Sequence, residues 1–140
     1  MKKLKGYVFS RKFNENSTPQ KIQNIILRDY SLKKNYNFIM SSVEYSMNNC
    51  FFVLEGLVKS LKKYDGVVAY SIFQMPLDQN KRVKIYKEFI KKKKELHFAL
   101  EDVVLSKNNL NNIDFIEETI SIRSVLNKTN VNIDRIKKYI

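Results

Sequence analysis

Strand-like and helix-like spacings of hydrophobic residues alternate along the whole chain, and this alternation predicts a series of βα units. Residues 4–9 form an apolar stretch of strand length, whereas isoleucines after residue 20 recur at helical spacing. No repeat and no linker rich in Pro, Gly or Ser interrupts the pattern. We therefore expect one α/β domain over residues 1–140, three-layered, with four to five mostly parallel strands.

One of the expected strands should be more deeply buried than the others. Residues 67–70 (Val-Val-Ala-Tyr) are an unbroken apolar run after an Asp65-Gly66 turn. Such a run is typical of a strand covered on both faces in the middle of a parallel sheet. Further strands are expected at residues 4–9, 36–40 and 96–100, and residues 103–105 either continue the last one or form a short fifth strand.

Four helices are expected between and after these strands. Ser17, Thr18 and Pro19 offer a hydroxyl cap and a proline at the first helical position, and Asp78 can cap a later helix. The last helix should cover residues 109–126, followed by a loosely packed polar tail over residues 127–140. The inward faces would consist of Ile22, Ile25, Ile26 and Tyr30; Phe51, Leu54, Leu57, Val58 and Leu61; Val83, Tyr86, Phe89 and Ile90; and Ile113, Ile116 and Ile120.

Composition narrows the class of protein. With 44% hydrophobic residues the chain can form a core without disulfides, and its single cysteine, Cys50, favours a reducing compartment. One cysteine and one histidine are too few for a zinc site, and three scattered glycines do not form a phosphate loop. No apolar run resembles a signal peptide or a membrane span. We expect a cytoplasmic protein without a metal, a cofactor or a membrane span.

The net charge of +12 raises the question of nucleic acid. Only five of the 26 basic residues are Arg, although Arg supplies the bidentate contacts by which proteins read nucleic acid. Abundant Lys, Asn and Ile are what an AT-rich genome encodes on a tolerant surface. A solvated lysine surface is therefore the expected explanation, nucleic acid is not the expected partner, and a phosphate-binding patch remains the alternative.

Polar residues gather where the predicted strands end. Ligands of open parallel sheets bind in the crevice beyond the carboxyl ends of the strands, so this rim is the expected site. Seven residues fall there: Ser10, Arg11, Glu44, Ser71, Gln74, His97 and Glu101.

His97 is the candidate general acid or base, because histidine titrates near neutral pH. Strand alternation puts Glu101 on the same face, where it could orient the imidazole. Alternatively His97 is a histidine at the edge of the core and Glu101 pairs with a surface lysine. Ser10 is a candidate nucleophile if His97 or Glu44 serves as its base, and otherwise a turn serine.

The remaining four rim residues are candidate substrate-binding groups. Arg11 lies beside a turn where an anionic group could dock, and Glu44, Ser71 and Gln74 would supply polar contacts to a ligand. Whether such a site is catalytic is left open by the sequence.

Four stretches carry a resemblance to a known family: Gly6-Tyr-Val-Phe-Ser-Arg11, Pro19-Gln-Lys-Ile-Gln-Asn24 with Leu27-Arg-Asp-Tyr30, Asp65-Gly-Val-Val-Ala-Tyr-Ser-Ile-Phe-Gln-Met-Pro76 and Leu96-His-Phe-Ala-Leu-Glu101. Over residues 5–120 the chain resembles the sporadic carbohydrate cluster family, small bacterial proteins encoded among surface-polysaccharide genes. The resemblance implies an accessory protein or small enzyme of lipopolysaccharide or O-antigen biosynthesis that binds a sugar or nucleotide-sugar. A non-catalytic partner of a carbohydrate biosynthesis enzyme is the alternative.

A fainter similarity runs to the catalytic domain of serine recombinases. That family has a Tyr-x-Arg-Val-Ser strand, and Ser10 falls on its nucleophile position. Val8 replaces the first arginine of the pattern, and Phe73-Gln74-Met75-Pro76 stands where Asp-Arg-Leu-Gly is expected. The similarity implies a flavodoxin-like or resolvase-like fold and a degenerate nucleic-acid binder as a second alternative, without DNA cleavage. An exposed sheet edge would also allow a homodimer.

Overall fold

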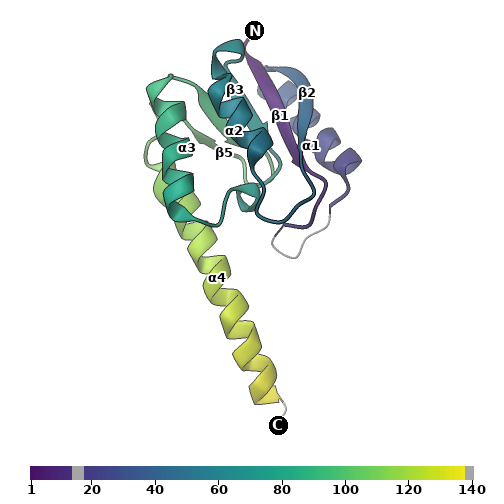
Figure 1. The fold of residues 1–140 in the computed structure, drawn as a ribbon, viewed down its shortest axis with the longest axis vertical. Coiled ribbons are helices and arrows are strands. Elements are labelled where there is room, and N and C mark those ends of the chain that lie inside the picture. Colours follow the sequence, from purple (N-terminus) through teal and green to yellow (C-terminus); the bar gives the residue numbers. More distant parts are fainter. Residues whose placement is uncertain (14–17, 138–140) are drawn as a thin grey trace.

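A computed structural model describes residues 1–13 and 18–137, with the backbone alone over residues 125–137. Its strands and helices alternate as the hydrophobic pattern predicts (Figure 1). In chain order they are β1 (Lys3–Phe9), α1 (Gln20–Lys33), β2 (Asn37–Glu44), α2 (Phe52–Lys59), β3 (Gly66–Ala69), α3 (Gln79–Lys91), β4 (Glu95–Phe98), β5 (Val103–Leu105) and α4 (Asn112–Lys137), with short 3₁₀ helices η1 (Leu61–Lys63) and η2 (Ile72–Gln74).

The five strands form one sheet in the order β2-β1-β3-β4-β5. The first four are parallel, and β5 runs antiparallel to β4. All four residues of β3 are buried at the centre of the sheet, which confirms the expectation from its apolar run. The strands approach so closely that a side chain at Gly66 would meet the carbonyl oxygen of Glu95. The predicted α/β class with a mostly parallel sheet is confirmed.

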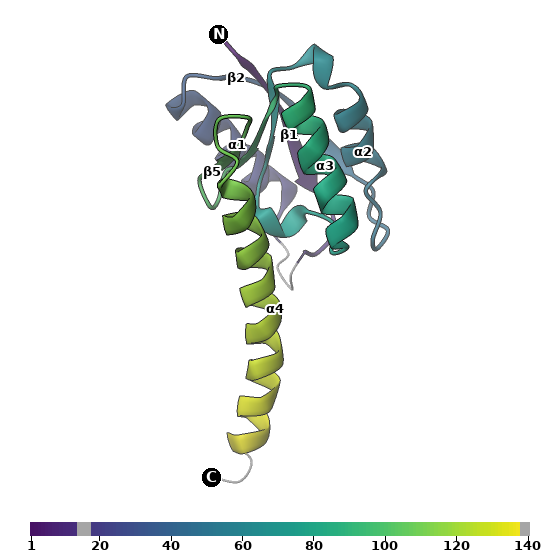
Figure 2. The same cartoon turned by 90° about the vertical axis from the view of Figure 1, so that its left-hand side faces the viewer.

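The helices make the fold three-layered, with α1 on one face of the sheet and α2 and α3 on the other (Figure 2). The connection from β1 leads to β2 on one side, and the chain then returns to β3 on the other side of β1. β1 and β3 therefore flank the point where the strand order reverses. In doubly wound sheets the ligand crevice lies at the carboxyl ends of such a pair, here at Phe9 and Ala69.

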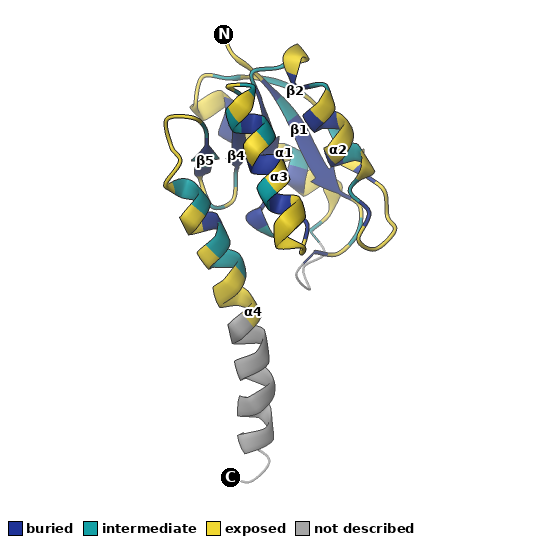
Figure 3. Cartoon of the chain, turned by 60° about the vertical axis from the view of Figure 1, so that its left-hand side comes forward, coloured by how far each residue is buried: buried dark blue, intermediate teal, exposed yellow. Residues whose placement is uncertain are grey.

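The core lies between the sheet and the helices on either face (Figure 3). Leu4 and Val8 of β1 and Phe89 of α3 are completely buried. Burial of each such side chain contributes about 1.5–3 kcal/mol relative to the exposed state. Ile116 of α4 is buried as well, so the first turns of α4 pack against the core of the α/β domain.

The inward face of α1 differs from the prediction. Ile22 and Ile25 are 44% and 55% exposed, and the buried face consists of Gln23, Leu27, Tyr30 and Ser31. Both sets of residues have helical spacing, and hydropathy alone predicts that the isoleucines face the core. In the structure Gln23 faces the core instead. The expected Ser17 cap lies outside the described residues, and Pro19 precedes the first helical residue without any side-chain cap.

Several element boundaries also differ. β2 continues to Glu44, so this residue belongs to the strand instead of following it. β4 ends at Phe98, and a turn with Asp102 at a positive φ of 53° separates it from β5. In α3 the buried face includes Arg82, whereas Val83 is only half-buried. The backbone of α4 stays helical to Lys137 and projects beyond the body (Figure 1).

The two edges of the sheet differ in their protection. At the β5 edge, Asn112 Nδ2 donates to the carbonyl oxygen of Val104 at 2.6 Å, so α4 covers part of this edge. At the β2 edge, Met40 is 79% exposed. An edge of this kind can pair with another strand, and the homodimer expected from the sequence stays a prediction.

Candidate functional site

Two buried glutamines close the crevice between β1 and β3. Gln23 Oε1 accepts from the amide of Phe9 at 3.0 Å, and Gln23 Nε2 donates to the carbonyl of Phe9 at 2.9 Å. Gln74 Nε2 donates to Gln23 Oε1 at 2.9 Å, while Gln74 Oε1 accepts from the amide of Tyr70 at 3.0 Å. The two amides therefore join the ends of β1 and β3 at the switch point. Gln74 lies at the predicted rim, but its amide is occupied by these bonds.

Glu44 is buried and serves as the cap of α2. Its carboxylate accepts from the amides of Val53 at 3.1 Å and Leu54 at 3.2 Å, and from the Tyr7 hydroxyl at 2.7 Å. A carboxylate at a helix N-terminus is stabilised by the free N–H groups and the helix dipole. Burial and the bond to Glu44 raise the pKa of the Tyr7 hydroxyl, so this hydroxyl remains a hydrogen-bond donor. The geometry assigns Glu44 a structural task within the β2–α2 connection.

Ser71 and Glu101 meet each other across the turns that follow β3 and β4. Ser71 Oγ donates to Glu101 Oε2 at 2.7 Å, and the amide of Ile72 donates to Glu101 Oε1 at 2.9 Å. Ser71 Oγ also accepts from the amide of Phe73 and so caps η2. These contacts correct the prediction that Glu101 orients His97, because the strand ends at Phe98 and the alternation no longer applies.

His97 is buried within β4, on the face covered by α1. The Tyr30 hydroxyl lies 2.7 Å from His97 Nδ1, and His97 Nε2 lies 2.8 Å from Glu95 Oε1. Glu95 also accepts from the Tyr36 hydroxyl at 2.6 Å and from Lys2 Nζ at 2.9 Å. Glu95 is the first residue of β4, so this cluster extends toward the amino end of the sheet. Glu95, which sequence reasoning missed, is the carboxylate that orients the imidazole.

The hydrogen bonds to Glu95 lead to a testable dependence of stability on pH. The bond from His97, together with those from Tyr36 and Lys2, lowers the pKa of the Glu95 carboxyl from 4.5 to about 2. A lowered folded-state pKa adds stability above the unfolded value, and this contribution disappears as pH falls from about 4.5 toward 2. We expect Glu95→Gln to be roughly 2 kcal/mol less stable than the parent at pH 6, with a smaller difference near pH 2.5.

Urea unfolding at both pH values measures this difference. Glu88→Gln is the matched control, because Glu88 forms an exposed i,i+4 pair with Lys92 and should cost little at either pH. A Glu95→Gln deficit that is the same at pH 6 and pH 2.5 would show that the loss arises from packing and not from the charge.

Ser10, which is exposed, and Arg11, which is half-buried, lie together at the carboxyl end of β1. Arg11 Nη1 donates to the carbonyl oxygen of Tyr45 at 2.6 Å, and its guanidinium lies 4.2 Å from the centre of the Phe9 ring. Ser10 Oγ donates to the carbonyl of Glu44 at 3.3 Å. A pocket of about 490 Å³ opens here, lined by Ser10, Arg11, Lys12, Thr18, Pro19 and Gln20.

The start of α1 borders this pocket through Thr18, Pro19 and Gln20. The N-cap residue, Pro19, provides no side-chain cap, and the first turn contains no acidic residue. The first N–H groups of a helix attract anions, and a guanidinium and an ammonium beside them strengthen that attraction. We call this set of Ser10, Arg11, Lys12 and the first turn of α1 the β1-end pocket. Chemically, it is suited to hold a phosphate or another oxyanion.

The seven predicted residues therefore divide into separate groups instead of lining one concave site. Ser10 and Arg11 belong to the β1-end pocket, whereas Ser71 pairs with Glu101, and Glu44, Gln74 and His97 are held by partners of their own. The chemical roles predicted for them remain untested by these positions. Lys12, which could have been found as the third polar residue after β1, was missed.

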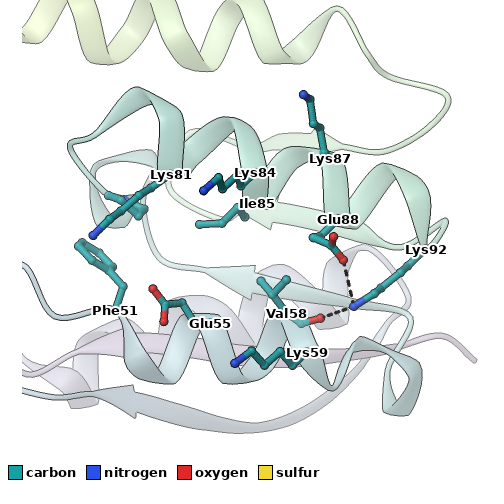
Figure 4. A pocket seen from close by; sticks show the side chains of 11 residues that line it. Phe51, Glu55, Val58, Lys59, Lys81, Lys84, Ile85, Lys87, Glu88 and Lys92 are labelled. Carbon is teal, nitrogen blue, oxygen red and sulfur yellow. Dashed lines mark hydrogen bonds and ion pairs between the residues drawn. The ribbon is translucent and has the colours of Figure 1, made fainter.

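A second concavity lies between α2 and α3, and only its Phe51 end approaches the strand-end rim (Figure 4). Its volume is about 590 Å³, and Val58 and Ile85 face each other across its floor. Lysines from both helices stand along its rim. No motif in the sequence pointed to this groove, because its residues come from two helices that the hydrophobic pattern treats separately.

The described parts of the chain contain neither a metal-binding cluster nor a membrane-spanning helix. Among the described side chains, those of residues 1–13 and 18–124, no group of three or more His, Cys, Asp or Glu could hold a metal ion. Within residues 1–13 and 18–137, no helix is long and apolar enough to cross a membrane.

The chain is similar in fold to known proteins, although its sequence identity to them is low. No family model matches the chain, and no curated protein matches it. A resolvase family site-specific recombinase from Streptococcus pneumoniae superimposes with a TM-score of 0.58 at 11% identity, covering 97% of this chain and 98% of that one. The N-terminal catalytic domain of TP901-1 integrase gives 0.54 at 12% identity, covering 92% and 98%. The resolvase-like fold is confirmed, whereas the resemblance to the sporadic carbohydrate cluster family has no support from these searches.

Proposed function

We propose that this chain is a non-cleaving binding protein of resolvase-like fold that holds a phosphate of nucleic acid in the β1-end pocket. The observation that carries the proposal is the accessible Ser10-Arg11-Lys12 segment beside the start of α1, where Pro19 at the N-cap position provides no side-chain cap. Guanidinium, ammonium and helix N–H groups together form a typical phosphate-binding set. The net charge of +12 would attract a polyanion to this pocket.

Arg11 is arranged in advance for such a contact. Its guanidinium lies 4.2 Å from the Phe9 ring centre and 5.0 Å from that of Phe51, and Nη1 is bonded to Tyr45. Ring stacking and this bond restrict the side chain before any ligand arrives, which lowers the entropy lost on binding. Among the described residues, only Nη1 of Arg11 has a hydrogen-bond partner, so the guanidinium retains donors for a phosphate oxygen.

The surroundings of Ser10 argue against strand cleavage. Phosphoryl transfer requires several positive groups around the scissile phosphate and a base for the nucleophile. Val8 and Gln74 stand at positions where the serine recombinase pattern has arginines; Val8 is buried and Gln74 is bonded to Gln23. His97 is bonded to Tyr30 and Glu95, and the Glu44 carboxylate caps α2. The pocket can bind a phosphate without supplying this chemistry.

The neighbours of this fold are described as a site-specific recombinase and an integrase catalytic domain, and both names support nucleic acid as the ligand. A nucleotide-sugar is the second candidate, since its diphosphate has the same chemistry and a pocket of about 490 Å³ has the size of a small-molecule site. This candidate would accommodate a role in surface-polysaccharide biosynthesis.

Fluorescence anisotropy with a labelled DNA duplex tests the proposal. We expect Arg11→Gln combined with Lys12→Gln to weaken binding about tenfold at low salt and to reduce the slope of log affinity against log salt by about two. The control is Lys62→Gln with Lys63→Gln, which removes the same charge from η1, outside the pocket, and should change affinity about twofold at most.

Two results would contradict the nucleic-acid assignment. Equal weakening by both pairs of substitutions would show diffuse attraction without a pocket. Saturable binding of uridine diphosphate glucose that Arg11→Gln with Lys12→Gln abolishes, together with no DNA binding at low salt, would establish the second candidate instead.

A further inference from the structure

The groove between α2 and α3 has an apolar floor with basic residues above it. Val58 and Ile85 are buried, and Phe51 lies near Lys81 at the end of the groove opposite Lys92 (Figure 4). Lys92 closes the other end, because its Nζ donates to the carbonyl of Val58 at 2.8 Å. α3 has 13 residues and is about 20 Å long, so one side of the groove offers nearly four helical turns.

Three lysines along the rim have no ion-pair partner among the described residues. Lys59, Lys81 and Lys84 are exposed, and no described residue forms an ion pair with them. Glu88, by contrast, is neutralised by Lys92 at 3.2 Å. Glu55 is the remaining acidic residue of the lining. The groove therefore suits an occupant with an apolar ridge and acidic flanks.

The exposed side of the first part of α4 has these properties. Phe115 and Ile122 are 49% and 58% exposed, and Glu118 lies between them at i, i+3 and i+7 spacing. Asp114 and Glu118 are exposed at i, i+4, and no basic residue occurs between Asn112 and Ile122. Such spacing is that of a helix that inserts one face into a groove.

The opposite face of the same helix is already occupied. Glu117 accepts from Arg82 Nε at 2.8 Å and from the Tyr86 hydroxyl at 2.8 Å, and Ile116 is buried in the core. These contacts fix α4 to α3 and leave the face with Phe115, Glu118 and Ile122 turned outward. That face is consequently presented by a rigid support and not by a flexible tail.

We propose that the occupant of the α2–α3 groove is a second copy of this chain, which inserts the Asp114–Ile122 face of its α4. Phe115 and Ile122 would lie on Val58 and Ile85, and Asp114 and Glu118 would meet Lys81 and Lys84. Two chains of net charge +12 repel each other, and a contact that joins an acidic surface to a basic one offsets this repulsion. A reciprocal pair of these contacts would close a dimer.

Sedimentation velocity over a range of concentrations tests this assignment by charge reversal. We expect self-association of the parent to be weakened about tenfold by Lys81→Glu with Lys84→Glu, and likewise by Asp114→Lys with Glu118→Lys. A mixture of the two variants should associate again, because each acidic face then meets a basic one. Lys62→Glu with Lys63→Glu, outside the groove lining, is the matched control and should leave association unchanged.

Three outcomes would overturn the proposal: a parent chain that stays monomeric at all concentrations, a control pair as disruptive as the groove pair, or no recovery in the mixture. Loss of DNA binding in Lys81→Glu with Lys84→Glu without any change in self-association would instead make the groove a nucleic-acid surface. The test is independent of the β1-end pocket, so failure of either proposal leaves the other standing.

Discussion

Glu44→Ala is expected to lower the free energy of unfolding by about 3 kcal/mol. The substitution leaves the buried Tyr7 hydroxyl without its acceptor at 2.7 Å and removes the partners of the amides of Val53 and Leu54. An unsatisfied buried donor costs about 1–3 kcal/mol, and a lost N-terminal cap costs about 1 kcal/mol. Equilibrium unfolding in urea, followed by far-ultraviolet circular dichroism, measures the effect.

The matched control is Glu55→Ala in the first turn of α2. The Glu55 side chain is exposed and forms no hydrogen bond with any described residue, so we expect its truncation to cost less than about 0.5 kcal/mol. Glu44→Gln retains an accepting oxygen and should lie between the parent and Glu44→Ala. If both alanine variants lost the same small amount, the carboxylate of Glu44 would not be the cap on which the β2–α2 connection depends.

Glu44 also shows which part of the site could be predicted from the sequence. The hydrophobic pattern located the ends of the strands, because alternating apolar runs and turns mark them directly. It could not show that Glu44 caps a helix beginning at Phe52, since a cap normally immediately precedes its helix. Its other partner, Tyr7, lies 37 residues earlier, and only the pairing of β1 with β2 brings the two together.

The pair of His97 and Glu101 shows how an alternation argument depends on the length of the strand. The rule holds as far as the backbone stays extended, and β4 ends at Phe98. Applied toward the N-terminus, the same rule places Glu95 on the face of His97, where the structure has the 2.8 Å contact. The position at which β4 ends therefore decides which carboxylate shares a face with His97. A hydrophobic pattern locates the middle of a strand better than its end.

The burial of Gln23 was not predicted, because the inward face of α1 was chosen from hydropathy alone. Ile22 and Ile25 are more hydrophobic than glutamine, yet they are exposed while Gln23 is buried. The main-chain groups of Phe9 at the end of β1 need partners, and Gln23 supplies both a donor and an acceptor. A buried amide of this kind follows from tertiary contacts that no local pattern contains.

The Gln23–Gln74 bridge leads to the second large expected effect. Gln23→Leu and Gln74→Leu should each lower the free energy of unfolding by about 3 kcal/mol, because each leaves main-chain groups unpaired in the core. In Gln23→Leu these are the N–H and C=O of Phe9, and in Gln74→Leu the N–H of Tyr70. Gln20→Leu, at an exposed position of α1, is the control and should change stability by less than about 0.5 kcal/mol.

The double variant distinguishes a bridge from two separate side chains. Because the 2.9 Å bond between the two amides is lost in either single variant, the double variant should cost less than the sum, by about 1 kcal/mol. Additive losses would mean that the amides act independently. A coupled loss would show that the two amides act as one bridge across the ends of β1 and β3.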